Sequence, residues 1–212
     1  MTDKSISDSL ALEIARPTLD IAPDYAEMAL DLVTESPLVH EVPVVKSVIA
    51  FYKTGMAIRE RHFVKKLLMF LKELRANSTE NERTREYRQR IETDFAFRQK
   101  VTEHLLVIID RFVTAEKTQI LAHLFQAHVR GDVLWEDFVS LSIVLDALQP
   151  RSYTFLGQMA ELTPPFSTHN SDSSDEAPLF AAGIANRFGT KFSITPLGQM
   201  LYMHGIKPAH RH

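Results

Sequence analysis

The residues of this sequence that could do chemistry are mainly cations, and most of them fall in one stretch. Between positions 53 and 75 there are seven Lys and Arg but only two acids, Glu60 and Glu73. With two cations near the C-terminus, the set is Lys53, Arg59, Arg61, Lys65, Lys66, Lys72, Arg75, Arg187 and Lys191. Cations at this density can bind the phosphates of a nucleic acid or the headgroups of an anionic membrane. These nine residues are therefore candidates for contact with an anionic surface.

The charge of the rest of the chain offers a second role for the same cations. Lys and Arg number 24 and Asp and Glu 27, so the net charge is −3. Residues 1–45 carry nine acids and two bases, whereas residues 46–76 carry eight bases and two acids. Opposite charges of this size attract each other within one chain. The basic stretch is then a helix face neutralised by the acidic N-terminal segment, and both interpretations stay open at this point.

Motifs for catalysis, metals and cofactors are missing from the sequence. There is no cysteine, no Gly-x-Ser-x-Gly, no Walker phosphate loop and no Gly-x-Gly-x-x-Gly. Nine histidines are present, but His123 and His128 are five apart, and there is no His-Glu-x-x-His to hold zinc. We therefore expect no catalytic residues, no metal and no cofactor, and a protein that is not an enzyme.

The elements that would position these residues are helices over most of the chain. Apolar residues recur at helical spacing and predict helices at 6–15, 25–33, 44–74 with a break at Gly55, 80–93, 95–112, 115–129 and 135–148. We expect Thr79 with Glu82 to begin the helix at 80, and Gly131 to end the helix before it in the left-handed conformation. Residues 1–150 are thus predicted to be a helical domain of short loops.

The last 62 residues have another pattern and are predicted to be a second, small domain, 151–212. Two short helices, 153–162 and 177–184, are separated by a Pro- and Ser-rich segment, 163–176, that we expect to be a disordered loop. A β-hairpin follows at 184–194. Thr195 and Pro196 then begin a last helix, which Gly205 is expected to end. The fold class is accordingly all-α in the main, a multi-helix bundle with a small C-terminal α+β segment.

Part of this C-terminal segment resembles a known domain. The order helix, short hairpin and "ITPLGQMLY" at 194–202 is similar to the last part of bacterial winged-helix domains. That resemblance implies that Arg187 and Lys191, in the hairpin or wing, contact DNA phosphates. The helix in the recognition position, 178–184, contains no Lys or Arg.

The helical part loosely resembles uncharacterised bacterial and prophage proteins of the abortive-infection alpha type. The similar phrases are "AFYKTGMAIRERHFVKKLLMFLKEL" at 50–74 and "EKTQILAHLFQAHVRGDVLWEDF" at 116–138. The resemblance implies phage defence or phage–host interaction and no catalytic residues.

Three functions remain for the whole chain. We expect first a non-enzymatic, cytoplasmic helical protein that acts through protein–protein contacts, since no signal peptide or spanning segment is apparent in the sequence. The alternatives are a nucleic-acid-binding regulator using the basic 53–90 surface, and a peripheral membrane protein using the amphipathic stretch 44–58. The sequence leaves the partner and the oligomeric state open.

Overall fold

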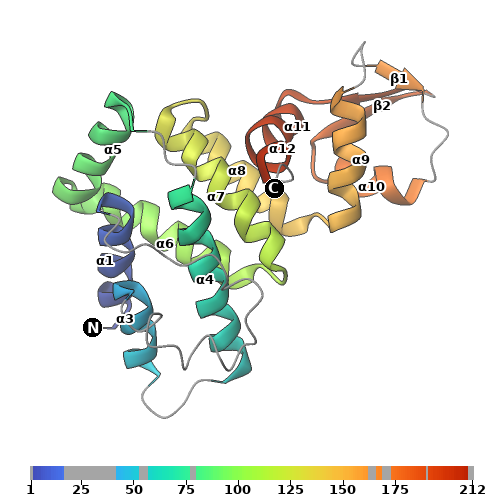
Figure 1. Ribbon diagram of the computed structural model, residues 1–212. Helices are drawn as coiled ribbons and strands as arrows, with labels where there is room; N and C mark the ends of the chain where they lie inside the picture. The colour runs from blue at the N-terminus through green and yellow to red at the C-terminus, as the bar shows by residue number, and fades with distance from the viewer. Residues whose placement is uncertain are drawn as a thin grey trace. The chain divides into compact units, whose positions relative to one another are not determined.

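A computed structural model describes residues 2–16, 42–52, 57–76, 80–161, 166–168, 173–189 and 191–209 (Figure 1). The chain forms two compact units, Met1–Ala122 and His123–His212. The division therefore does not fall at the predicted boundary of 150. Helix α8 contacts α11 near the C-terminus, and this packing places it in the second unit. The predicted helix at 25–33, Lys53 and Gly55 lie outside the described residues.

The described part of the chain is mainly helical with one small antiparallel sheet, which confirms the predicted fold class. The helices of the first unit are α1 (Thr2–Ala15), α3 (Pro43–Phe51), α4 (Ile58–Ala76), α5 (Glu82–Thr93) and α6 (Phe95–Arg111), and α7 (Ala115–Arg130) contains the division between the units. The second unit continues with α8 (Trp135–Ala147), α9 (Pro150–Glu161), β1 (Phe166–Thr168), α10 (Ser173–Ala181), β2 (Ala185–Phe188), β3 (Lys191–Ile194), α11 (Pro196–Leu201), the π-helix η3 (Tyr202–Ile206) and α12 (Lys207–Ala209).

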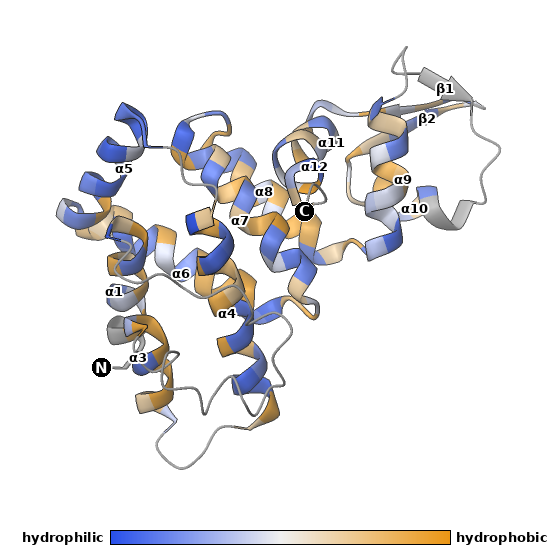
Figure 2. Ribbon diagram, in the orientation of Figure 1, coloured by the Kyte–Doolittle hydropathy of each residue, from blue (hydrophilic) through white to orange (hydrophobic). Residues whose placement is uncertain are grey.

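Helix α6 is the central element of the first unit. It contacts α1, α4 and α5, and its stripe of Val101, Leu105 and Ile109 is fully buried. Each such side chain contributes about 1.5–3 kcal/mol relative to an exposed one. Helix α5, in contrast, is polar along most of its length (Figure 2) and buries little besides Ile91 and Thr84. The first unit is thus assembled around one face of α6.

Side-chain caps set the start of α5 and α6. The Asp94 carboxylate accepts a hydrogen bond from the amide of Phe97 at 3.0 Å, at the start predicted for α6. The predicted cap of α5 was wrong. Asn81, not Thr79, caps that helix by accepting from the amide of Thr84 at 2.8 Å. A short amide side chain caps as well as a hydroxyl, so the nearer Asn sets the first residue.

The segment predicted to be a disordered loop, 163–176, contains regular structure, so this prediction was wrong for its described residues. β1 pairs with β3, with Ser167 opposite Phe192, and α10 begins at Ser173. The sheet has the order β1-β3-β2. Backbone pairing explains the strand, because β3 in a lone hairpin would leave one row of its amides and carbonyls without partners. The rest of the segment lies outside the described residues.

The hairpin and the helix after it confirm the predicted order, and their junction is tight. The Thr195 hydroxyl accepts from the amide of Gly198 at 3.2 Å and donates to the carbonyl of Gly183 at 3.1 Å. A Cβ on Gly198 would lie 2.2 Å from the carbonyl oxygen of Ile184. Two residues of the Thr-Pro-Leu-Gly motif therefore have structural roles. Thr195 caps the start of α11, and Gly198 allows the helix to approach the hairpin backbone.

Two glycines expected to end helices behave differently. Gly131 has a φ of 83° after α7, as predicted for a left-handed C-terminal residue. Gly205 does not end its helix, so that prediction was wrong. It is buried within η3, outside the left-handed region, and the chain continues into α12. The widened turn of a π-helix can absorb a residue without ending the helix.

Candidate functional site

The cation at the centre of the predicted basic surface, Lys66, is buried. Its ammonium group donates to the carbonyl oxygens of Asp110 at 2.7 Å and Phe112 at 2.6 Å, and only 7% of the residue is exposed. These carbonyls stand at the C-terminal end of α6, where backbone acceptors lack partners within the helix and where a cation is favoured. Lys66 therefore caps the C-terminal end of α6 and does not face an anionic surface.

Two further cations of α4 connect it to other helices. Arg75 forms an ion pair with Glu13 of α1, with 13% and 1% of the two side chains exposed. Arg59 pairs with Asp110 of α6 at 2.5 Å on the surface. The Arg75–Glu13 pair is the intramolecular attraction expected between the acidic N-terminal segment and the basic stretch.

The remaining predicted cations lie in different surroundings. Arg61, Lys65 and Lys72 are half-buried on α4, each with an interaction of its own. Arg187, in the second unit, donates to Glu176 at 3.1 Å and to the carbonyl of Gly189 at 2.9 Å. Lys191 is exposed on β3. Lys66, Arg75, Arg59 and Arg187 thus contact identified partners within the chain, and Arg61, Lys65 and Lys72 also have interactions there.

The amphipathic stretch 44–58, the other candidate for surface binding, also has buried side chains. In α3, which covers most of the amphipathic stretch 44–58, the apolar residues Val44, Val45 and Val48 are fully buried. Arg88 and Arg90, which extend the basic stretch onto α5, pair with Glu80 at 2.6 Å and with Asp94 at 3.5 Å. Arg90 also lies over the ring of Phe97, 4.0 Å from its centroid.

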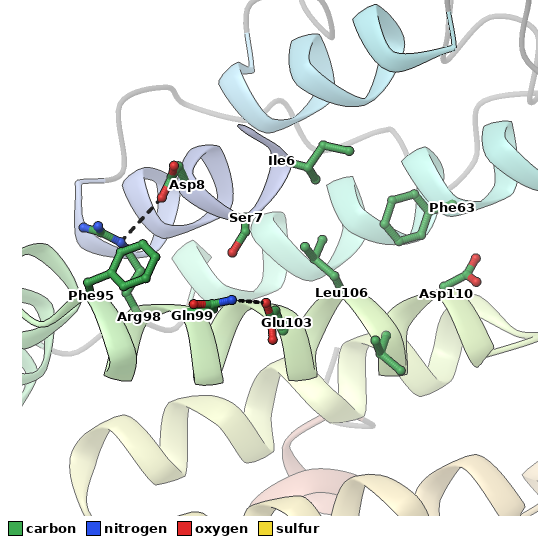
Figure 3. A pocket seen from close by; sticks show the side chains of 11 residues that line it. Ile6, Ser7, Asp8, Phe63, Phe95, Arg98, Gln99, Glu103, Leu106 and Asp110 are labelled. Atoms are coloured by element: carbon green, nitrogen blue, oxygen red, sulfur yellow. Dashed lines mark hydrogen bonds and ion pairs between the residues drawn. The ribbon is translucent and has the colours of Figure 1, made fainter. Parts of the chain in front are cut away.

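A groove that no sequence motif predicts lies on the first unit. It has a volume of about 550 Å³ and is open to solvent along α6, with α1 and α4 beside it (Figure 3). It is lined by Ile6, Ser7 and Asp8 of α1, Phe63 of α4, and Phe95, Arg98, Gln99, Glu103, Leu106, Val107 and Asp110 of α6.

The groove follows the length of α6. Its lining includes positions 95, 99, 103, 106 and 110, which share one face of the helix at intervals of three and four residues. At about 1.5 Å per residue, the distance from Phe95 to Asp110 along the axis is roughly 22 Å. Phe95 and Val107 are 48% and 61% exposed. Helix α6 therefore presents a second, partly apolar face next to its buried stripe.

The polar groups of the groove are arranged in pairs. The Asp8 carboxylate lies 3.6 Å from the Arg98 guanidinium, and the Gln99 amide donates to Glu103 at 2.6 Å (Figure 3). Ser7 and Thr102 share a hydrogen bond between their hydroxyls, which holds α1 against α6. These pairs include no nucleophile beside a general base. The groove can hold apolar side chains and interact with charge at its rim.

The sequence contains a weak signal for this groove. Leu106 and Val107 are apolar but fall outside the stripe of α6 that faces the core. A helix that is apolar on more than one face has a second surface to cover. Only the packing of α1 and α4 shows which of these residues remain exposed.

A second cavity, of about 400 Å³, lies in the second unit between α9 and the end of the chain. It is lined by Tyr153, Thr154, Gly157, Gln158, Glu161, Tyr202, Ile206 and Lys207. The Tyr202 hydroxyl donates to Glu161 at 2.6 Å, and Lys207 lies 3.4 Å from the same carboxylate. The hydroxyl first, and the ammonium second, lower the pKa of Glu161. This carboxylate is well exposed, so the cluster joins two helices at the surface.

The histidines that the structure describes, His62, His104, His123, His128 and His204, lie in helices. In the part of the chain that the structure describes, no three His, Asp or Glu are close enough to hold a metal ion. His128 stacks on Phe138, with ring centroids 5.9 Å apart, and its Nδ1 lies 3.0 Å from the carbonyl of Val133. Among the same residues, no helix is long and apolar enough to cross a membrane.

Comparisons with protein-family models, with curated proteins and with solved structures find no match for this chain.

Proposed function

We propose that this protein acts by binding another protein, and that the groove on α6 receives one face of a partner's helix. The observation that carries the proposal is the exposed apolar face of α6, where Phe95 lines one end of an open groove and Leu106, Val107 and Phe63 line it toward the other end. Apolar side chains gathered in one exposed groove mark sites of contact with other molecules.

The shape of the groove favours a helix as the ligand. A volume of about 550 Å³ would also suit a small molecule. The length of the groove along α6 favours a helix over a small molecule, because roughly 22 Å corresponds to four turns of a docked helix. Helices bind grooves through apolar anchors at intervals of three and four residues, which is the spacing of the groove residues on α6.

The proposal also includes a cellular compartment, a biological process and a non-enzymatic role. Because the chain has no cysteine, a reducing compartment suits it, and we place it in the cytoplasm of a bacterium. The resemblance to abortive-infection proteins supports a part in phage defence. The role is non-enzymatic, since the groove supports binding without an arrangement for catalysis.

The two alternatives have less support. Nucleic-acid binding through 53–90 would need cations that now hold α6 and α1, above all Lys66 and Arg75. Membrane association through 44–58 would need the apolar side chains of α3, of which Val44, Val45 and Val48 are buried. Neither alternative is favoured by a specific observation.

A pair of matched variants tests the proposal. A library of 16-residue helical peptides with one apolar face is selected against the protein, and the binders are measured by fluorescence anisotropy. Val107→Asp places a charge in the groove, and we expect at least tenfold weaker binding because the docked peptide would desolvate that charge. Val113→Asp is the control, since Val113 is 89% exposed and does not line the groove. Binders that are equally sensitive to both variants, or a library without binders, would refute the proposal.

A further inference from the structure

The charges of the groove are unevenly compensated. Its lining includes three acids, Asp8, Glu103 and Asp110, and one base, Arg98. Arg98 lies against Asp8, and Asp110 is paired with Arg59. Glu103 accepts a hydrogen bond only from the neutral amide of Gln99, and no cation of the described residues pairs with it. The groove therefore has one carboxylate whose charge is not balanced.

Glu103 stands near the middle of the groove. It is eight residues after Phe95 and seven before Asp110, so about 10–12 Å of α6 extend on either side of it. Leu106 follows one turn later (Figure 3), and Val107 is the next residue of the lining. A helix docked on these apolar residues would cover Glu103 and remove water from its carboxylate. An unpaired carboxylate opposes such docking, whereas a carboxylate that meets a cation does not.

From this arrangement we infer that the partner of the groove is a cationic amphipathic helix, with a Lys or Arg of the partner paired to Glu103. The inference rests on the proposed function and adds to it the chemistry of the partner. Apolar contacts with Phe95 and Val107 supply affinity, and Glu103 supplies selection, because a neutral or acidic residue opposite it leaves a buried charge without a partner.

Charge also distinguishes this partner from the chain's own acidic segment. Residues 17–41 contain six Asp and Glu and no Lys or Arg. Such a segment would bring more negative charge to a groove whose one uncompensated group is a carboxylate. A separate molecule with a basic helix is the better complement.

The test uses three peptides that differ at one residue. Each is a 16-residue helix with leucines on one face, and the residue at the centre of that face is Lys, Glu or norleucine. Binding to the full-length protein is measured by fluorescence anisotropy at low and at physiological salt. We expect the Lys peptide to bind at least tenfold more tightly than the Glu peptide, with the norleucine peptide between them.

Variants of the protein assign this preference to one carboxylate. Glu103→Gln keeps the hydrogen-bonding shape and removes the charge, so the preference for Lys over Glu should fall to threefold or less. Glu86→Gln, at an exposed acid on α5 outside the groove, makes the same change in net charge and should keep the preference. A preference that survives Glu103→Gln, or falls equally in both variants, overturns the inference.

The outcomes separate this inference from the proposed function. Peptides that bind in a Val107-dependent way without any preference for Lys leave the groove as a binding site and refute only the cationic partner. Peptides whose binding does not depend on Val107 refute the proposed function itself. If a synthetic 17–41 peptide displaces the Lys peptide more strongly than its scrambled version, the occupant is the chain's own segment. If the protein is a dimer that Val107→Asp dissociates, the occupant is a second copy. Either result overturns the inference.

Discussion

The ammonium nitrogen of Lys66 lies 2.6 Å from the carbonyl oxygen of Phe112, in the interior of the first unit. The same nitrogen reaches the carbonyl of Asp110, so one side chain of α4 satisfies two backbone acceptors at the end of α6. A residue that the sequence offers as a surface cation is thus an internal cap, and this changes what its substitution should do.

Lys66→Met should destabilise the first unit. The methionine fills a similar volume but leaves two carbonyls without their charged donor, and hydrogen bonds to charged groups contribute about 1.5–3 kcal/mol each. We expect a loss of about 3–6 kcal/mol in the free energy of unfolding, measured by urea denaturation. The control is Lys100→Met, an exposed position on α6, which should change stability by about 0.5 kcal/mol or less. Equal effects at the two positions would contradict the role assigned to Lys66.

Removing only one partner of the ion pair between Arg75 and Glu13 should lower the free energy of unfolding. Glu13 is almost fully buried, so Arg75→Met removes the cation that this interior carboxylate faces across the pair. Loss of one partner of a buried pair costs about 3–5 kcal/mol. The double variant Arg75→Met with Glu13→Gln removes both charges and should recover at least half of that loss. A double variant less stable than the single one would show that the pair is not the source of the effect.

Gly198→Ala should destabilise the second unit. The added methyl would lie 2.2 Å from the carbonyl oxygen of Ile184 and 2.7 Å from a side-chain carbon of Ile194, so α11 must move away from the hairpin. Overpacking of this kind costs about 1–3 kcal/mol. Gln199→Ala, at the next and exposed position of the same helix, serves as the control and should be nearly neutral. Thermal unfolding followed by circular dichroism compares them, and a neutral Gly198→Ala would refute the tight contact.

The pKa of Glu161 should depend on Tyr202. The hydrogen bond from the tyrosine hydroxyl is the largest single cause of its lowered pKa, and the hydrogen bond and charge of Lys207 add to it. Tyr202→Phe should therefore raise this pKa towards the ordinary value of about 4.3, and Lys207→Met should raise it too. Side-chain carboxyl NMR during a pH titration measures both shifts. Because the folded pKa is below the unfolded one, the interaction stabilises the fold above the unfolded pKa and is lost as pH falls through the folded value. A Glu161 pKa unchanged by Tyr202→Phe would contradict this cause.

Local signals in the sequence predicted most helices and the hairpin. Gly131 is an example, because a left-handed C-terminal residue acts within a few residues of itself and needs no distant partner. Where two capping residues compete, local rules are weaker: Asn81 rather than Thr79 begins α5. β1 was missed because a three-residue strand has almost no periodic pattern and depends on pairing with β3.

The sequence by itself determined the helical class, the hairpin and the absence of catalytic motifs, because helix periodicity, caps and motif spacing are properties of neighbouring residues. Only the tertiary structure decided which cations are buried and paired, and where the groove lies. Lys66 and Arg75 look like surface cations in the sequence, but their partners are 44 or more residues away along the chain. The apolar face of α6 likewise becomes a groove only when α1 and α4 pack beside it, since burial depends on which helices meet.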